Sequence, residues 1–296
     1  MKKTVFTGAG VAIITPMHAD GSVNYEKLKE VIDFQIDNKT DAIVICGTTG
    51  ESATMSHQEH KDVIKFTVDY VNKRVPVVAG TGSNETYFAA ELSMYAEEVG
   101  ADALLLVTPY YNKTSQEGLV AHYFYIADRV NIPIILYSVP SRTGLNITPE
   151  TCKKLSEHKN IVAIKEASGN ISQIAKIAEL CGDDLQIYSG NDDQIVPIMS
   201  LGGIGVISVL SNILPRETHN ICAEFLKGNI DKARDMQLKY VSLINALFSD
   251  VNPIPVKEAM NMMGLGMGPL RMPLAPMTDS ARAALREELK KHGLVK

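Results

Sequence analysis

The sequence is poor in cysteine and lacks the cysteine pairs that bind zinc or form redox sites. Four cysteines occur in 296 residues, at positions 46, 152, 181 and 222, and no two of them have a CxxC spacing. A secreted scaffold held together by disulfides is shorter and much richer in cysteine. We therefore expect buried free thiols and a reducing, cytoplasmic environment.

Long apolar runs and an excess of basic residues are also missing. No apolar run approaches the roughly 18 residues of a membrane span, and the first eight residues lack the apolar stretch of a signal peptide. The formal net charge of −5 argues against broad binding to nucleic acids or anionic membranes. With 45% hydrophobic and 21% charged residues, the composition is ordinary for a soluble globular protein.

Several common catalytic motifs are absent as well. There is no P-loop, no Ser-His-Asp arrangement and no G-x-G-x-x-G after the first apolar run. His57 and His60 stand three residues apart, but no third ligand lies near them in sequence, so we expect no metal site. An enzyme that activates a carbonyl compound without a metal or an organic cofactor needs another electron sink. An iminium formed on a lysine is such a sink.

A short apolar run, a polar turn and an amphipathic stretch follow one another eight times along the chain. The runs are rich in Val, Ile and Leu and do not alternate with polar residues, as is typical of parallel strands covered on both faces. They cover residues 11–15, 42–46, 75–79, 103–107, 132–137, 161–164, 185–188 and 204–209. This repetition predicts a single α/β-class (β/α)8 TIM barrel. A doubly wound open sheet is the alternative.

Helix-start signals separate the apolar runs. Ser56 and Glu59 have the three-residue spacing of a capping box, and Thr114 and Glu117 repeat it. Thr148 followed by proline has the pattern of an N-cap and a first helical residue.

The chain continues well beyond the last expected strand. Helices are predicted at 215–227, 230–248, 256–263 and 280–292, which is more than one closing helix. We expect a barrel formed by residues 1–225. Residues 226–296 are expected to form a C-terminal helical region packed on the barrel or on a partner subunit.

The candidate catalytic residues follow the expected strands, because barrel enzymes build their sites at the carboxyl ends of strands. Lys165 comes directly after the apolar run 161–164, where the barrel core stops. Burial disfavours an ammonium group and lowers the pKa of a lysine, and a neutral amine is a nucleophile toward carbonyl groups. A lysine that extends to solvent is the alternative.

Other polar residues follow the neighbouring strands. Tyr137 ends the run before Lys165, and adjacent strands lie about 4.8 Å apart, so both side chains are placed to face one substrate. Thr48 and Thr49 lie between glycines, where hydroxyl and N–H groups suit a carboxylate. Arg142 offers a guanidinium that could bind a carboxylate through two hydrogen bonds. Taken singly, each also fits a residue that caps the core, an ordinary turn or a surface arginine.

Taken together, five motifs resemble the pyruvate-dependent family of (β/α)8 barrels that includes dihydrodipicolinate synthase and N-acetylneuraminate lyase. They are GTTGE at 47–51, VTPYYNK at 107–113, YSVPSRTG at 137–144, IVAIKEAS at 161–168 and GGIGVISV at 202–209. The resemblance spans nearly the whole chain. It implies a lyase that forms a Schiff base with pyruvate, needs no cofactor and works as a homotetramer, a dimer of dimers.

The resemblance implies two groups of site residues. The catalytic group would form the Schiff base and relay protons: Lys165, Tyr137, Thr48 and Tyr111, the last reaching across a subunit interface. The binding group would hold the substrates: Thr49, Arg142, Gly190 and Ile207.

Thr49 and Arg142 resemble the branch of this family that condenses pyruvate with L-aspartate 4-semialdehyde in lysine and diaminopimelate biosynthesis. The lyases of the family typically lack this arginine. One alternative is a 2-keto-3-deoxy sugar acid aldolase or a neuraminate lyase that uses the same Lys165 and Tyr137. Another is a catalytically silent metabolite-binding protein, against which the retained lysine and tyrosines count.

A further set of residues resembles the site at which lysine inhibits some members of the family. It comprises Ser52, Ala53, His57, His60, Asn84 and Tyr110. Lysine-sensitive members have a glutamate where this chain has Phe88. Because a phenyl ring does not form an ion pair with the lysine ammonium group, we expect weak feedback inhibition.

Overall fold

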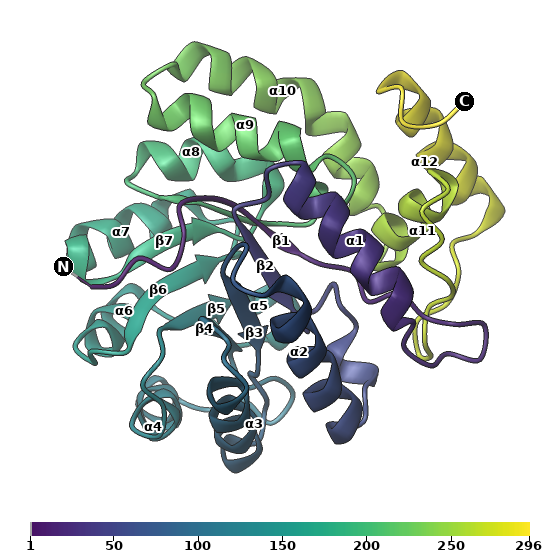
Figure 1. Cartoon of the computed structure of the whole chain (residues 1–296). Helices are drawn as coiled ribbons and strands as arrows, with labels where there is room; N and C mark the ends of the chain where they lie inside the picture. Colours follow the sequence, from purple (N-terminus) through teal and green to yellow (C-terminus); the bar gives the residue numbers. More distant parts are fainter. Residues whose placement is uncertain (1) are drawn as a thin grey trace.

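The computed structural model describes residues 2–296, and a closed barrel of eight parallel strands lies at its centre (Figure 1). The strands follow one another in chain order, and β1 (Gly8–Ala12) pairs with β8 (Gly205–Ser208) to close the barrel. Between them lie β2 (Ala42–Ile45), β3 (Val77–Gly80), β4 (Ala103–Val107), β5 (Ile134–Ser138), β6 (Ile161–Glu166) and β7 (Gln186–Ser189). The predicted (β/α)8 barrel is confirmed.

The strands are apolar on both faces because each one separates two cores. In β2, Ala42 and Val44 belong to the cluster inside the barrel, whereas Ile43 and Ile45 belong to the cluster between the barrel and its helices. Alternation along a strand sends successive side chains to opposite faces. Runs of Val, Ile and Leu therefore predicted the strands correctly.

The first strand was placed wrongly. It covers Gly8–Ala12 and not residues 11–15. Its two glycines hid it, because a glycine-rich segment does not read as a strand. Gly10 leaves room for the ring of Phe6, which would lie 2.8 Å from a Cβ atom at that position.

Helices surround the barrel and connect its strands (Figure 1). They are α1 (Tyr25–Asp37), α2 (His57–Val71), α3 (Thr86–Glu98), α4 (Gln116–Ala127), a short α5 (Pro140–Thr143), α6 (Pro149–Ser156), α7 (Ile171–Cys181), α8 (Ile195–Ser200) and α9 (Pro215–Leu226). The capping box of Ser56 and Glu59 and the Thr148 cap are confirmed. The Thr114 cap is wrong, because α4 begins one residue later than expected and its cap is the Ser115 hydroxyl, which accepts the backbone N–H of Gly118.

Three more helices form the C-terminal region: α10 (Ile230–Leu247), α11 (Ile254–Met262) and α12 (Asp279–Lys291). They begin and end within two residues of the predicted bounds. Helix α10 packs on α9 and α12, and α11 packs on α12. The residues between α11 and α12 return to the barrel mouth, where they contact the loop after β2. The division of the chain at residues 225 and 226 stays a prediction.

The cysteines are buried and free, as expected. Burial raises the pKa of the Cys46 and Cys222 thiols, which disfavours the reactive thiolate. Within residues 2–296, no helix combines the length and the apolar character needed to cross a membrane.

Candidate active site

A cavity of about 340 Å³ opens at the carboxyl ends of the barrel strands. Most of the predicted site residues line it: Thr48, Thr49, Tyr137, Arg142, Lys165 and Gly190. The structure therefore brings together residues that are more than a hundred positions apart in the chain. Tyr111 and Ile207 are not part of this lining. Tyr111 is 93% exposed, and Ile207 is fully buried inside the barrel.

Lys165 lies on β6 directly beside Tyr137 of β5, with which it pairs in the sheet. Its side chain is only 5% exposed, and Nζ lies 4.4 Å from the centre of the Tyr137 ring. Burial lowers the pKa of Lys165 from 10.5 to about 8, the Asp192 carboxylate acts in the opposite direction, and Arg142 lowers the pKa further. A minor fraction of the amine, roughly a tenth, is therefore neutral at pH 7.

Tyr137 connects Lys165 to the loop after β2. Burial raises the pKa of its phenol, and Arg142 and a hydrogen bond with Thr48 only partly oppose this effect. The phenol therefore keeps its proton at neutral pH and stays available as a donor. Lys165 thus lies against the Tyr137 ring, and the Tyr137 phenol is hydrogen-bonded with Thr48.

Asp192 was not predicted as a site residue. It follows β7, is 2% exposed and accepts hydrogen bonds from the backbone N–H groups of Val209 and Leu210, at 3.0 and 2.9 Å. Burial raises the pKa of its carboxyl group, whereas its hydrogen bonds and Lys165 lower it. Its negative charge favours the cationic form of Lys165. The next residue, Asp193, is also an aspartate that follows the same strand, so the sequence alone does not show which of the two carboxylates lies near Lys165.

Glu166 faces away from Lys165, because successive residues of a strand point to opposite sides. Its carboxylate is fully buried and accepts hydrogen bonds from the Ser168 backbone and hydroxyl at 2.8 Å and from Gln173 Nε2 at 2.7 Å. These bonds hold the end of β6 in place, and with it the adjacent Lys165.

The connection between α10 and α11 also reaches the cavity, which sequence reasoning missed. Phe248, Asp250 and Asn252 line it. Asn252 Nδ2 donates to the Thr49 hydroxyl at 3.1 Å, and the Asn252 carbonyl accepts from Arg142 Nη2 at 3.1 Å. Asn252 thus joins two of the predicted substrate-binding residues.

A second cavity of about 610 Å³ lies beside the first and shares Thr48, Val139 and Arg142 with it. Its lining includes five of the six predicted feedback residues: Ser52, Ala53, His57, His60 and Tyr110. Phe88 also lines it, with its ring centre 4.7 Å from that of His57. The side chain of the sixth, Asn84, is not part of the lining, and its carbonyl accepts from Asn112 Nδ2 at 2.9 Å.

The two histidines of this second cavity have separate partners. His57 Nε2 lies 3.2 Å from a Glu91 oxygen, and His60 Nε2 lies 2.8 Å from the Gly80 carbonyl. Burial lowers the pKa of His60. In the part of the chain that the structure describes, no three His, Cys, Asp or Glu side chains are grouped in a way that could hold a metal ion.

Residues 5–292 match the profile of the dihydrodipicolinate synthetase family. The chain belongs to this family. It is 62% identical over 292 residues to the 4-hydroxy-tetrahydrodipicolinate synthase of Clostridium perfringens, an alignment that covers 99% of the chain and 100% of that protein. The synthase of Acetivibrio thermocellus is 58% identical over 295 residues, with 100% of both proteins covered. The predicted family and its synthase branch are confirmed.

Solved structures of the dihydrodipicolinate synthetase family have the same fold. The pyruvate complex of the chloride-inhibited dihydrodipicolinate synthase from Acinetobacter baumannii superposes with a TM-score of 0.96 at 43% identity, covering 99% of this chain and 100% of that one. The chain is therefore a lyase-type synthase, as predicted.

Proposed function

We propose that the chain condenses pyruvate with L-aspartate 4-semialdehyde to 4-hydroxy-tetrahydrodipicolinate, as its relatives' name implies. The observation that carries this proposal is the buried Lys165 amine, with a pKa of about 8, beside Tyr137 and Thr48 in one cavity. The pyruvate complex of a relative with the same fold supports the first substrate. This reaction belongs to lysine and diaminopimelate biosynthesis, and free buried cysteines are consistent with the cytoplasm.

The chemistry begins with the neutral Lys165 amine, which is roughly a tenth of the total at pH 7 for a pKa of about 8. It attacks the keto carbon of pyruvate, and the carbinolamine that forms loses water to give a protonated Schiff base. Tyr137 and Thr48 move the protons that these steps require. No metal or organic cofactor takes part.

The Schiff base then makes the new carbon–carbon bond. Its iminium withdraws electrons, so the methyl group of the bound pyruvate loses a proton and an enamine forms. The enamine carbon attacks the aldehyde carbon of the semialdehyde, whose oxygen takes up a proton. The amino group of the semialdehyde then adds to the iminium carbon, and the Lys165 amine leaves as the ring of the product closes. Thr49 and the backbone at Gly190 and Ile207 hold the pyruvate carboxylate, and Arg142 holds the carboxylate of the second substrate.

Tyr111 belongs to this proposal through a neighbouring subunit. Its side chain is 93% exposed and its backbone is left-handed, with φ of 66°, in the loop after β4. We place it in the proton relay of a partner subunit, within a homotetramer. If so, Tyr111→Phe should lower kcat while sedimentation shows an unchanged tetramer. A monomer with full activity would contradict both statements.

The second cavity is proposed as a lysine site of low affinity. Phe88 puts a ring against His57 where lysine-sensitive relatives have a carboxylate. Titration of the enzyme with lysine should therefore show little inhibition at millimolar concentration, and Phe88→Glu should increase it. Strong inhibition of the natural protein would contradict this expectation.

A steady-state comparison of substrates tests the proposed function. The purified protein should form product from pyruvate and L-aspartate 4-semialdehyde with a far higher kcat/KM than it cleaves 2-keto-3-deoxy sugar acids or N-acetylneuraminate. Arg142 supports this order, because its guanidinium lines the cavity of about 340 Å³ and suits the carboxylate of the semialdehyde. Preferred cleavage of a sugar acid would assign the chain to the lyase alternative.

A further inference from the structure

The loop with the sequence GTTGE, residues 47–51, follows β2 and carries Thr48 and Thr49. Two tight turns form it, with Gly50 N donating to the Gly47 carbonyl and Glu51 N to the Thr48 carbonyl, both at 3.1 Å. Glu51 adopts a left-handed backbone with φ of 57°, which a residue with a side chain rarely adopts without support. Contacts from elsewhere in the chain must therefore hold the loop in shape.

Glu51 receives that support from the C-terminal region. Its side chain is fully buried, and Lys257 Nζ of α11 donates to Oε1 at 2.7 Å. The backbone N–H of Arg271 donates to Oε2 at 3.0 Å. Lys257 is only 1% exposed, and although burial lowers the pKa of its amine, Glu51 acts against that effect. Each charge therefore requires the other.

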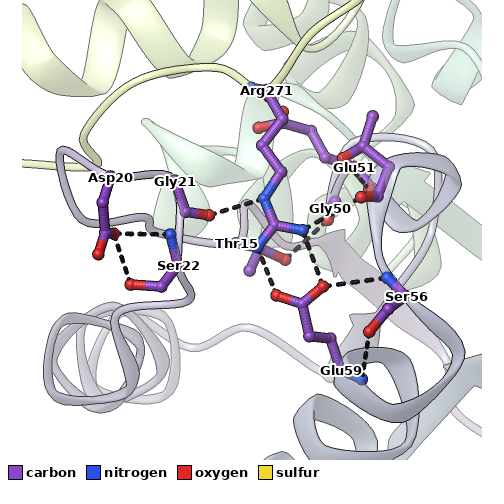
Figure 2. A network of polar contacts seen from close by, with 10 residues as sticks. Thr15, Asp20, Gly21, Ser22, Gly50, Glu51, Ser56, Glu59 and Arg271 are labelled. Atoms are coloured by element: carbon purple, nitrogen blue, oxygen red, sulfur yellow. Dashed lines mark hydrogen bonds and ion pairs between the residues drawn. The ribbon is translucent and has the colours of Figure 1, made fainter.

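Arg271 is itself fixed by several bonds, which Figure 2 shows around its guanidinium. It donates to the Gly21 carbonyl at 2.7 Å, to the Thr54 carbonyl at 3.1 Å and to both carboxylate oxygens of Glu59. On the barrel side of the loop, the Thr15 hydroxyl donates to the Gly50 carbonyl at 2.8 Å. These bonds hold the groups around Glu51 in place. Among residues 2–296, Lys257 is the only residue whose positively charged side chain forms an ion pair with the Glu51 carboxylate.

We propose that Lys257 is a positioning residue of the active site, which sets Thr48 and Thr49 against the substrate by holding Glu51. A buried ion pair adds little net stability, so its value here lies in the orientation of the loop. The inference rests on the proposed function, because that function gives Thr49 the pyruvate carboxylate and Thr48 a place in the proton relay. Lys165 stands on β6 and does not depend on this contact.

The test uses Lys257→Met in the full-length protein, which keeps the length of the side chain and removes its charge. The KM for pyruvate should rise about tenfold or more, since small displacements of positioning groups have large effects. The apparent pKa of the acid limb in the pH profile of kcat/KM should stay unchanged, because Lys165 keeps its surroundings. Lys257→Arg should recover part of the loss.

Arg282→Met is the matched control. Arg282 pairs with Glu258, the neighbour of Lys257 on α11, but this pair lies at the surface and Arg282 is 56% exposed. The control should leave both KM and kcat unchanged. If Lys257→Met does not fold, the double variant Glu51→Gln/Lys257→Met removes the unpaired buried charge, and it should show the same rise in the KM for pyruvate.

A folded Lys257 variant with a pyruvate KM within twofold of the natural protein would overturn the inference. A lower melting temperature alone, with KM and kcat unchanged, would do the same by showing a purely structural role. Failure of the proposed function gives a different result. In that case the natural protein itself would form no pyruvate adduct on Lys165, whatever residue stands at position 257.

Discussion

Replacing Lys165 by methionine should abolish activity and at the same time stabilise the fold. The folded protein buries this amine almost completely, with 5% of it exposed, and burial lowers its pKa from 10.5 to about 8. At neutral pH most of the amine is nevertheless charged. The native state therefore contains a buried ammonium group that methionine does not have.

The size of this effect follows from the pKa. The lowering from 10.5 to about 8 corresponds to about 3 kcal/mol, at about 1.4 kcal/mol per pKa unit. Below pH 8 both the folded and the unfolded state bind the proton, so the full cost is present. Between pH 8 and 10.5 only the unfolded state still binds it, so the stability of the natural protein rises with pH across this window.

Urea unfolding of the natural protein and of Lys165→Met provides the assay. The variant should be more stable by up to about 3 kcal/mol at pH 7, and the difference should shrink as the pH rises from 8 to 10.5. Lys176→Met, at an exposed lysine paired with Glu179, is the control and should change stability by less than about 0.5 kcal/mol. A destabilised Lys165 variant, or a difference that does not depend on pH, would refute the reasoning.

Three further predictions concern charges around the site. Asp192→Asn removes a carboxylate that raises the pKa of Lys165. When the rate of imine formation is measured against pH, the acid limb of the profile should therefore move to lower pH, and a move to higher pH would contradict this. Arg142→Met should raise the KM for the semialdehyde by about tenfold or more, as expected for a lost hydrogen bond between charged groups, with a much smaller rise for pyruvate. The bond from Arg271 lowers the pKa of Glu59 from 4.5 to about 2, so its stabilising effect is present above pH 4.5 and disappears as the pH falls toward 2. Glu59→Gln should therefore lower the urea midpoint at pH 6 but not near pH 2, and an equal loss at both values would rule out the ion pair.

The barrel could be predicted because every strand is buried on both faces and therefore forms an apolar run. The exception is β1, where Gly8 and Gly10 replace the expected apolar residues. Lys165 and Tyr137 were found for a related reason. Each is the polar residue at which an apolar run stops, and the closed sheet places these two side by side.

The contribution of the C-terminal region could not be predicted. Asn252 bonds to Thr49 across 203 residues and Lys257 bonds to Glu51 across 206. On its helix Lys257 reads as an ordinary solvated lysine, because nothing local shows that the opposite charge lies in a loop after β2. Tyr111 and Ile207 were assigned by resemblance alone, and the cavity of this chain does not include them.

Borohydride trapping with pyruvate tests the central claim most directly. Intact-protein and peptide mass spectrometry of the natural protein should show one reduced pyruvate adduct, confined to the peptide that contains Lys165. Lys165→Arg keeps a cation at this position but cannot form an imine, so it should show no adduct. An adduct of the same yield in the variant, or none in the folded natural protein, would contradict Schiff-base chemistry on Lys165.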